Sequence, residues 1–281
     1  MSRRDYSRQV IANQPVNYVL LSVAAVAMII PIYWMVVSSL KGLNPGSSMA
    51  PPLPSEFSFD AFERVLGGQN YARWYANSLI VAGASTVLSV TLSVAAAYAL
   101  ARFVFPGRRA LGAAMLLIQL APGVLVAIPM YSILYNLNLL NTQVGLSAAY
   151  VTRALPFCTW MLWGFFRSLP VELEEAAMVD GANRFQVLRR VVLPLSWPGI
   201  TVAAMFTFVL AWEEYLFALM IMTREQALTL TVGASRLVTT ESISVGELMA
   251  YSVLMTIPVA VVFGLVQKHM VSGMTAGALK G

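Results

Sequence analysis

Six runs of apolar residues, each long enough to cross a lipid bilayer, dominate this sequence. They occupy residues 17–39, 77–101, 110–135, 144–166, 195–222 and 248–268. A helix needs about 20 apolar residues to cross the hydrocarbon core, because each residue adds about 1.5 Å to its length. The chain is 58% hydrophobic and 11% charged, more apolar than a soluble domain tolerates. The runs predict an all-α, polytopic membrane protein whose six transmembrane helices form one domain over residues 17–268.

The first run follows a basic segment, residues 1–16, in an order also found in secretory signal peptides. The apolar core of a signal peptide is about 7–15 residues long and leads promptly to a small-residue cleavage site. The run over residues 17–39 is longer than that, and no such site follows promptly. It is therefore predicted to remain in place as the first span.

Arginine and lysine residues are distributed unequally between the two sides of the predicted membrane. Twelve lie on one side, five lie on the other, and Arg153 falls within the fourth span. Because cytoplasmic loops carry the excess of basic residues, the N-terminal segment 1–16, the loop 167–194 and the C-terminal tail 269–281 are predicted to be cytoplasmic. The same rule explains the formal charge of +5, so membrane lipid is the expected surrounding and nucleic acid is not an expected partner.

The residues needed for metal binding or nucleophilic catalysis are scarce. Cys158 is the single cysteine and His269 the single histidine, so no intramolecular disulfide can form and a histidine-rich metal site is not expected. The sequence also lacks the GxxxxGK[ST] phosphate loop with which many proteins bind ATP. No catalytic residue, metal site or cofactor is therefore predicted in this chain.

A compact charged segment, EEAAMVDGANRFQVLRRVVLPL, interrupts the apolar pattern after the fourth run. Pro170 suits a first helical turn, and Glu174 and Glu175 favour the positive end of a helix dipole. A helix over about 170–180 is predicted to stop at Asp180 and Gly181, where glycine can adopt the left-handed conformation that ends a helix.

A second short helix, over about 182–191, is predicted to follow and to end at Leu193-Pro194. Phe185, Leu188 and Val192 fall on one face of it at helical spacing, which gives an apolar stripe beside a charged rim. The segment is thus a helix-turn-helix at the inner membrane surface. It could rest on lipid headgroups, but the inner leaflet is anionic and attracts Lys and Arg, so its acidic residues favour a protein partner.

The spacing of this segment resembles a known motif. Glu175-Ala176-Ala177, three residues, Gly181, nine residues, Val191, one residue and Leu193-Pro194 closely match the EAA motif, which has isoleucine where this chain has Val191. The motif marks the membrane subunits of binding-protein-dependent ABC importers. Asn77-Ser78-Leu79, the segment LPFCTWMLWGFFRSLP and the tail GMTAGALKG are similar to the carbohydrate-importing, maltose-type (MalG-like) branch.

This resemblance implies a function and a set of partners. The chain would be the permease subunit of an importer in a bacterial-type inner membrane, working by alternating access on a di- or oligosaccharide or a related sugar or polyol. Its partners would be a second permease subunit, two ATP-binding subunits that carry ATP and Mg, and an extracytoplasmic solute-binding protein. Members of the family usually have Trp-Asn before an acidic residue where this chain has Trp212-Glu213-Glu214, and often a tryptophan where it has Val245.

The resemblance also implies that the EAA segment docks into a cleft on the ATPase. The coupling residues would be Glu174, Glu175, Ala176, Ala177, Asp180, Gly181, Phe185 and Leu188. Glu174 and Glu175 are expected to pair with basic groups of the ATPase, the two alanines to allow close approach, and Phe185 and Leu188 to supply a buried apolar anchor. The tail TAGALKG either reaches the ATPase as well or frays as an ordinary terminus.

Charged residues inside two spans suggest a second site. Arg153 and Glu214 each lie about 13 Å in from the outer interface at the helical rise per residue, a depth at which charges need a partner or a watery cavity. Arg153 is predicted to meet Glu213 or Glu214, with Tyr215 beside them. Either a structural ion pair between neighbouring spans or a contact with the transported substrate would explain the pair.

Two rival functions from other classes are less consistent with the sequence. A secondary transporter usually contains a pseudo-repeat with broken helices, whereas no repeat is visible here and the EAA segment would have no purpose. An intramembrane enzyme would need a catalytic cluster. Within the importer class, amino acids and inorganic anions are alternative cargoes. The sequences of the tail and of the fourth span favour carbohydrates over both.

Overall fold

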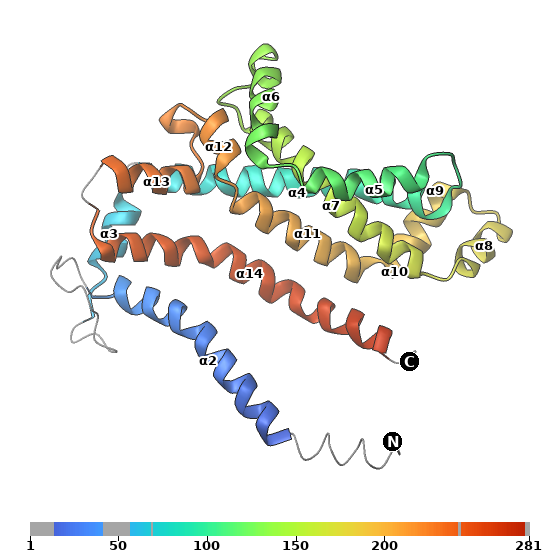
Figure 1. Ribbon diagram of the computed structural model, residues 1–281, viewed down its shortest axis with the longest axis horizontal. Helices are drawn as coiled ribbons and strands as arrows, with labels where there is room; N and C mark the ends of the chain where they lie inside the picture. The colour runs from blue at the N-terminus through green and yellow to red at the C-terminus, as the bar shows by residue number, and fades with distance from the viewer. Residues whose placement is uncertain (1–13, 42–56, 69, 241–242, 279–281) are drawn as a thin grey trace. The chain divides into compact units, whose positions relative to one another are not determined.

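A computed structural model describes residues 14–41, 57–68, 70–240 and 243–278 (Figure 1). Across these ranges the chain is helical, with one isolated bridge between Lys41 and Ser58, in agreement with the predicted all-α class. The chain divides into two compact units. One comprises residues up to Gly68 and Thr240–Thr256, and the other comprises Gln69–Thr239 and the residues from Ile257 onward.

The first unit contains α2 (Gln14–Ser39), α3 (Asp60–Gly67) and the beginning of α14 (Val245–Ala278). The apolar stretch of α2 is not buried by the protein itself, as suits a helix surrounded by lipid. The short amphipathic helix α3 buries Ala61 and Val65. Its Arg64 Nη1 lies 3.5 Å from Glu247 Oε1, on the first turn of α14.

The second unit is built around α4 (Tyr71–Arg102) and α7 (Gln143–Ser168), which pack along one another and against α11 (Trp197–Trp212). Buried small residues repeat at every fourth position of α4, at Ser85, Ser89, Ser93 and Ala97. Small side chains on one face of a membrane helix let a neighbouring backbone approach closely. Ser93 uses this proximity to donate to the Leu155 carbonyl at 3.3 Å and to accept a bond of 3.0 Å from Thr159.

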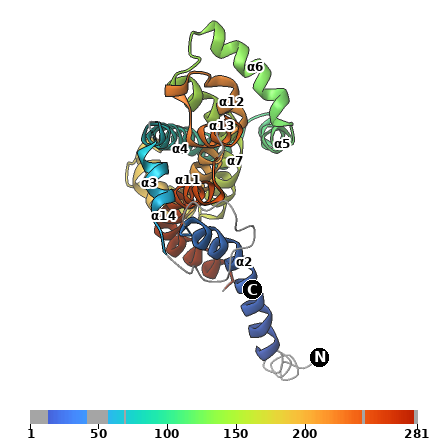
Figure 2. The same cartoon turned by 90° about the vertical axis from the view of Figure 1, so that its left-hand side faces the viewer.

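The run over residues 110–135 is two helices, which corrects the prediction of one continuous span. α5 (Arg108–Gln119) and α6 (Gly123–Asn136) meet at a bend of 99°. Pro122 is the cause, because a proline biases the residue before it away from helical angles, and Pro122 itself has a ψ of 127°. α6 consequently runs in a different direction from α5 (Figures 1 and 2) and packs against the short helix over Leu216–Ile221.

The run over residues 195–222 is also interrupted. α11 ends at Trp212, and α12 (Leu216–Ile221) begins after a break at Glu213–Tyr215. The polar segment that follows contains the turn η2 (Glu225–Ala227) and the helix α13 (Leu230–Thr240). The fifth predicted span is therefore a helix of 16 residues with a broken end, and its interruption is where Glu213 and Glu214 lie.

Asn77 and Ser78, near the start of α4, hold the segment between α12 and α13 against the helix. Asn77 Nδ2 donates to the carbonyls of Gln226 at 3.0 Å and Leu228 at 2.9 Å, while its Oδ1 accepts a 2.8 Å bond from Gln143 Nε2. Ser78 Oγ accepts from the Leu230 N–H at 2.8 Å. Backbone groups that would otherwise be buried without partners are satisfied by these contacts.

Three helices, α2, α4 and α14, are long and apolar enough to cross a bilayer, and the number reaches five if each of two bent pairs counts as one span. α7 is 26 residues long but is not among them. The prediction of a polytopic membrane protein is thus confirmed, whereas the count of six is not. Of the predicted N-terminal segment 1–16 and C-terminal tail 269–281, residues 1–13 and 279–281 lie outside the described residues, and residues 269–278 continue α14.

Candidate functional site

The first helix of the EAA segment is α8 (Glu172–Val179), which begins two residues after Pro170. The chain leaves it through a Schellman motif, in which two N–H groups return to the carbonyls of the last turn. Gly181 N–H donates to Met178 O and Ala182 N–H to Ala177 O, each at 3.0 Å. Gly181 has a φ of +87°, which confirms the predicted left-handed turn.

The next helix, α9 (Arg184–Val187), begins with a capping box. Asn183 Oδ1 accepts from the Gln186 N–H at 2.9 Å, and Gln186 Oε1 accepts from the Asn183 N–H at 2.8 Å. This reciprocal pair fixes the point at which the chain re-enters a helix after Gly181. In the letters DGANRFQ, the asparagine followed three residues later by glutamine was a usable sequence signal.

The second helix ends at Leu195, one residue beyond the predicted end at Leu193-Pro194. α9 runs into a π-helical turn, η1 (Leu188–Val192), and then into α10 (Leu193–Leu195). A proline ring clashes with the carbonyl four residues earlier in an α-helix. The π turn just before Pro194 is wider than an α-helical turn and makes room for the ring, so the helix passes through Pro194. In this turn the Leu193 N–H donates to the carbonyl of Leu188, five residues earlier.

The π turn also changes which side chains are buried, which corrects the predicted apolar face. Val187 and Val192, five residues apart, are fully buried in the core between α4, α7 and α11. Leu188 is partly buried against the same core. Phe185, by contrast, is 70% exposed, so of the two predicted anchors Phe185 is the one open to another protein over most of its surface.

Glu174 is buried inside the chain, which corrects the expectation that it pairs with an ATPase. Its Oε1 lies 2.6 Å from Arg102 Nε, and its Oε2 accepts a 3.0 Å bond from Tyr98 Oη. Arg102 also donates to the Leu169 carbonyl at 3.4 Å. Both partners come from the end of α4, so α8 is fastened to a long membrane helix by a buried ion pair. Nothing in the spacing of Arg102 signalled this partnership.

Five residues of the segment are exposed, and we call them the coupling surface after the role that the resemblance to the EAA motif implies: Glu175, Ala176, Asp180, Gly181 and Phe185. Ala177 turns inward instead and packs against the core. Between α8 and η1 lies an open pocket of about 410 Å³, lined in part by Asp180, Gly181 and Arg190. A Cβ at Gly181 would meet no atom within 4 Å, so glycine is required there by backbone angle and not by crowding within the chain.

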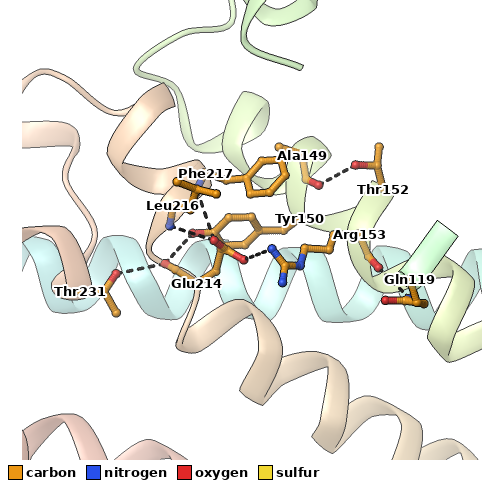
Figure 3. A network of polar contacts seen from close by, with 9 residues as sticks. All are labelled: Gln119, Ala149, Tyr150, Thr152, Arg153, Glu214, Leu216, Phe217 and Thr231. Carbon is orange, nitrogen blue, oxygen red and sulfur yellow. Dashed lines mark hydrogen bonds and ion pairs between the residues drawn. The ribbon is translucent and has the colours of Figure 1, made fainter. Parts of the chain in front are cut away.

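The second predicted site forms at the break between α11 and α12 (Figure 3). Arg153 Nη1, on α7, lies 3.0 Å from Glu214 Oε2, so the predicted pairing is confirmed with Glu214 as the partner. The Arg153 side chain is 48% exposed and that of Glu214 only 9%. Glu213 and Tyr215 are exposed beside the pair, and within the described residues Glu213 forms no ion pair with Arg153.

Glu214 has a second role that its sequence position did not reveal. Its Oε1 accepts from the N–H groups of Leu216 at 2.9 Å and Phe217 at 3.2 Å, so the carboxylate covers the free N–H groups at the start of α12. Its backbone carbonyl accepts from Tyr150 Oη at 3.2 Å and Thr231 Oγ1 at 3.1 Å. The break in the fifth span is thus tied to α7 and α13 by polar contacts (Figure 3).

The Arg153 side chain is held from two further directions. Its guanidinium carbon lies 5.8 Å from the centre of the Phe217 ring, a cation–π distance. A Cβ on Gly123, at the start of α6, would lie 3.1 Å from Arg153 Nη1. Arg153 therefore contacts both the break after α11 and the start of α6, and about half of its side chain remains exposed.

Known proteins of similar sequence are transport permeases. The chain is 36% identical over 257 residues, 91% of this chain and 93% of the relative, to the diacetylchitobiose uptake system permease protein DasC of Streptomyces coelicolor. It is 35% identical to the trehalose transport system permease protein SugB of Mycobacterium tuberculosis, over 90% of this chain and 93% of that one. The maltose-type resemblance is confirmed by 35% identity to the trehalose/maltose permease protein MalG of Thermococcus litoralis, over 94% and 97% of the two chains.

A solved structure has the same fold. A chain of a bacterial ABC transporter involved in the import of the acidic polysaccharide alginate superimposes with a TM-score of 0.75 and is 26% identical, over 95% of this chain and 98% of that one. The family model of the binding-protein-dependent transport system inner membrane component matches residues 89–276, which include α7, the EAA segment and the break after α11. The chain therefore belongs to the family of binding-protein-dependent transport system inner membrane components, whose relatives here are sugar ABC permeases.

Proposed function

We propose that this chain is the permease subunit of an ATP-driven importer and translocates a di- or oligosaccharide, or a related sugar or polyol, by alternating access. The observation that carries the proposal is the two-sided EAA segment. One side is locked to the chain through Glu174 and Arg102, and the other presents the coupling surface. A segment of this kind can transmit force, since a partner that moves the exposed side also moves α4.

The coupling surface has the chemistry of a protein interface. Phe185 is 70% exposed and Val179 87% exposed, in a segment outside the membrane-spanning helices. Large exposed apolar side chains beside charges are typical of interaction sites, and buried aromatic anchors dominate binding energy once a partner covers them. Glu175 and Asp180 supply negative charges that basic residues of an ATPase cleft would neutralise.

The energy for import is proposed to come from two partner subunits that bind ATP and Mg, because this sequence has no phosphate loop of its own. A second permease subunit and an extracytoplasmic solute-binding protein would complete the assembly. The names of the relatives support a sugar cargo, and a structure of the alginate transporter was solved in complex with a pentasaccharide-bound periplasmic protein. ATP-driven closure of the docked ATPases would switch the spans between two rigid arrangements.

The translocation path is proposed to pass the break between α11 and α12. Arg153 and Glu214 supply a charge pair at that break, and the half-exposed guanidinium offers donors that a sugar hydroxyl can accept. Glu213 and Tyr215 are exposed on the same short stretch. In the proposed orientation both termini and the EAA segment are cytoplasmic, as the distribution of basic residues predicts.

Reversing the charge of Glu175 is expected to uncouple ATP hydrolysis from transport. Glu175→Lys replaces a carboxylate of the coupling surface by a cation. Loss of one partner of a charge pair in a desolvated interface typically costs about 2–5 kcal/mol of binding free energy. Substrate-stimulated ATPase activity and sugar uptake should therefore fall at least about thirtyfold in vesicles that contain the whole complex with its binding protein. The matched control is Glu63→Lys on α3, an exposed carboxylate far along the chain, which should leave both rates unchanged.

A companion variant separates the two roles of Gly181. Asparagine tolerates the left-handed conformation better than other residues with a side chain, so Gly181→Asn should preserve the turn and the assembly of the chain in the membrane. Its side chain would nevertheless protrude from the coupling surface, and ATPase coupling should be lost. If uptake survives both Glu175→Lys and Gly181→Asn, the coupling role of this surface is wrong.

A further inference from the structure

A basic pocket at the other end of α7 from the break after α11 takes no part in the proposed coupling or translocation. It has a volume of about 700 Å³ and is lined by the α4–α5 connection and the first turn of α5 on one side, and by Trp163 and Arg167 of α7 on the other. Three arginines, Arg108, Arg109 and Arg167, line it, and none of the described lining residues is acidic. The pocket is thus suited to an anion.

The first turn of α5 adds further donors. Gly107 precedes the helix with a φ of +85°, and the N–H groups of Arg109 and Ala110 are too near the start of the helix to have partners within it. The partial positive charge of a helix N-terminus favours a negative group at that position. Arg108 and Arg109 stand on the same turn, so backbone and side-chain donors converge.

Trp163 forms the opposite wall of the pocket. Its indole Nε1 is buried and so is out of reach of a ligand in the pocket. The ring cannot easily move away, because it lies directly over Gly112, where an added Cβ would lie 2.5 Å from Cζ3. Arg167 stacks on the same ring with its guanidinium carbon 5.7 Å from the ring centre.

The rim of the pocket indicates which anion it would bind. Val104, which lines the pocket, is 93% exposed, so the short connection between α4 and α5 presents an apolar side chain to the surroundings. A pocket for a soluble anion would have no need of such a rim. Acyl chains beneath a phosphate would cover it, and tryptophan and arginine are the residues found at the headgroup level of membranes.

We propose that this pocket binds the phosphate headgroup of an anionic phospholipid of the inner leaflet. Arg108, Arg109 and Arg167 would grip the phosphate oxygens, for which guanidinium has a matching two-pronged geometry. The first turn of α5 would supply further donors, and Val104 would contact the acyl chains. The lipid would join α5 to α7, the two helices whose ends form the pocket.

Native mass spectrometry of the full chain in the assembled complex tests this proposal. The complex is purified from membranes into nanodiscs of phosphatidylcholine with roughly 20–30% phosphatidylglycerol, a range chosen to represent an anionic leaflet, and the retained lipid is counted. The wild type should hold phosphatidylglycerol in preference to phosphatidylcholine. Arg108→Gln with Arg109→Gln should reduce that preference about thirtyfold, at the usual contribution of each basic residue near an anionic membrane.

The control variant is Arg189→Gln with Arg190→Gln, which removes the same charge from the π turn η1. The distribution of basic residues predicts that η1 and the pocket lie on the same side of the membrane. This control should retain the lipid. Trp163→Phe preserves an aromatic ring over Gly112 and removes only the buried N–H, so this variant should also retain the lipid. Equal retention in the wild type and both double variants, equal binding of the two lipids, or displacement by millimolar glycerol 3-phosphate would each overturn the proposal.

Discussion

Glu174→Ala is expected to destabilise the chain by about 3–5 kcal/mol, the usual cost of removing one partner from a buried ion pair. The Arg102 side chain is only 6% exposed and would keep its charge without the carboxylate 2.6 Å away, and Tyr98 Oη would lose its acceptor as well. The complex should show a lower unfolding temperature and faster proteolysis within the EAA segment. Glu175→Ala is the matched control. The Glu175 carboxylate is exposed, so its removal should change the free energy of unfolding by no more than about 0.5 kcal/mol.

A double replacement distinguishes charge burial from loss of packing. Replacing both partners of a buried ion pair by apolar side chains of similar size is often neutral, so Arg102→Met with Glu174→Leu should be more stable than either single variant. If the double variant unfolds as readily as Glu174→Ala, the ion pair is not what holds α8 to α4. If its stability is restored while ATPase coupling is still lost, the pair has a role in transmission beyond folding.

The EAA segment shows which parts of a site can be predicted from sequence. Gly181 was predictable because its backbone requirement is local, and so was the pairing of Arg153 with an acidic residue of the fifth span, because the bilayer forces buried charges together. The burial of Glu174 was not predictable. Its partners Tyr98 and Arg102 are more than 70 residues earlier, and the acidic run offered three similar carboxylates with no local sign of which one faced inward.

The predicted helices failed where local chemistry overrides an apolar pattern. Pro122 bends the third run by forcing the chain out of helical angles, although its neighbours are apolar. The helix expected to end at Leu193-Pro194 continues one residue further, to Leu195, because a π turn before Pro194 accommodates the ring. The same π turn replaces the α-helical spacing by one of five residues, which explains why Val187 joined Val192 in the core in place of Phe185.

Arg153→Gln is expected to reduce sugar uptake at least about tenfold while leaving the unfolding temperature of the complex nearly unchanged. Arg153 is half exposed, and a partly solvated ion pair contributes about 1 kcal/mol or less to stability. The loss of its charge would therefore act mainly on the translocation path. Uptake per folded complex, measured in vesicles with the binding protein, separates the two roles, because an unchanged rate would leave Arg153 as a purely structural partner of Glu214.

Glu214 is expected to respond in the opposite way, since its carboxylate also covers the start of α12. Glu214→Gln keeps an acceptor for the N–H groups of Leu216 and Phe217, whereas Glu214→Ala leaves both without one, at about 1–3 kcal/mol for each unsatisfied group. Glu214→Ala should thus lower the unfolding temperature more than Glu214→Gln. For the same reason the charge-swapped pair Arg153→Glu with Glu214→Arg should not restore function, because arginine has donors and no acceptor. Full rescue by the swap would show that the ion pair alone matters and that the contacts of Glu214 with the start of α12 do not.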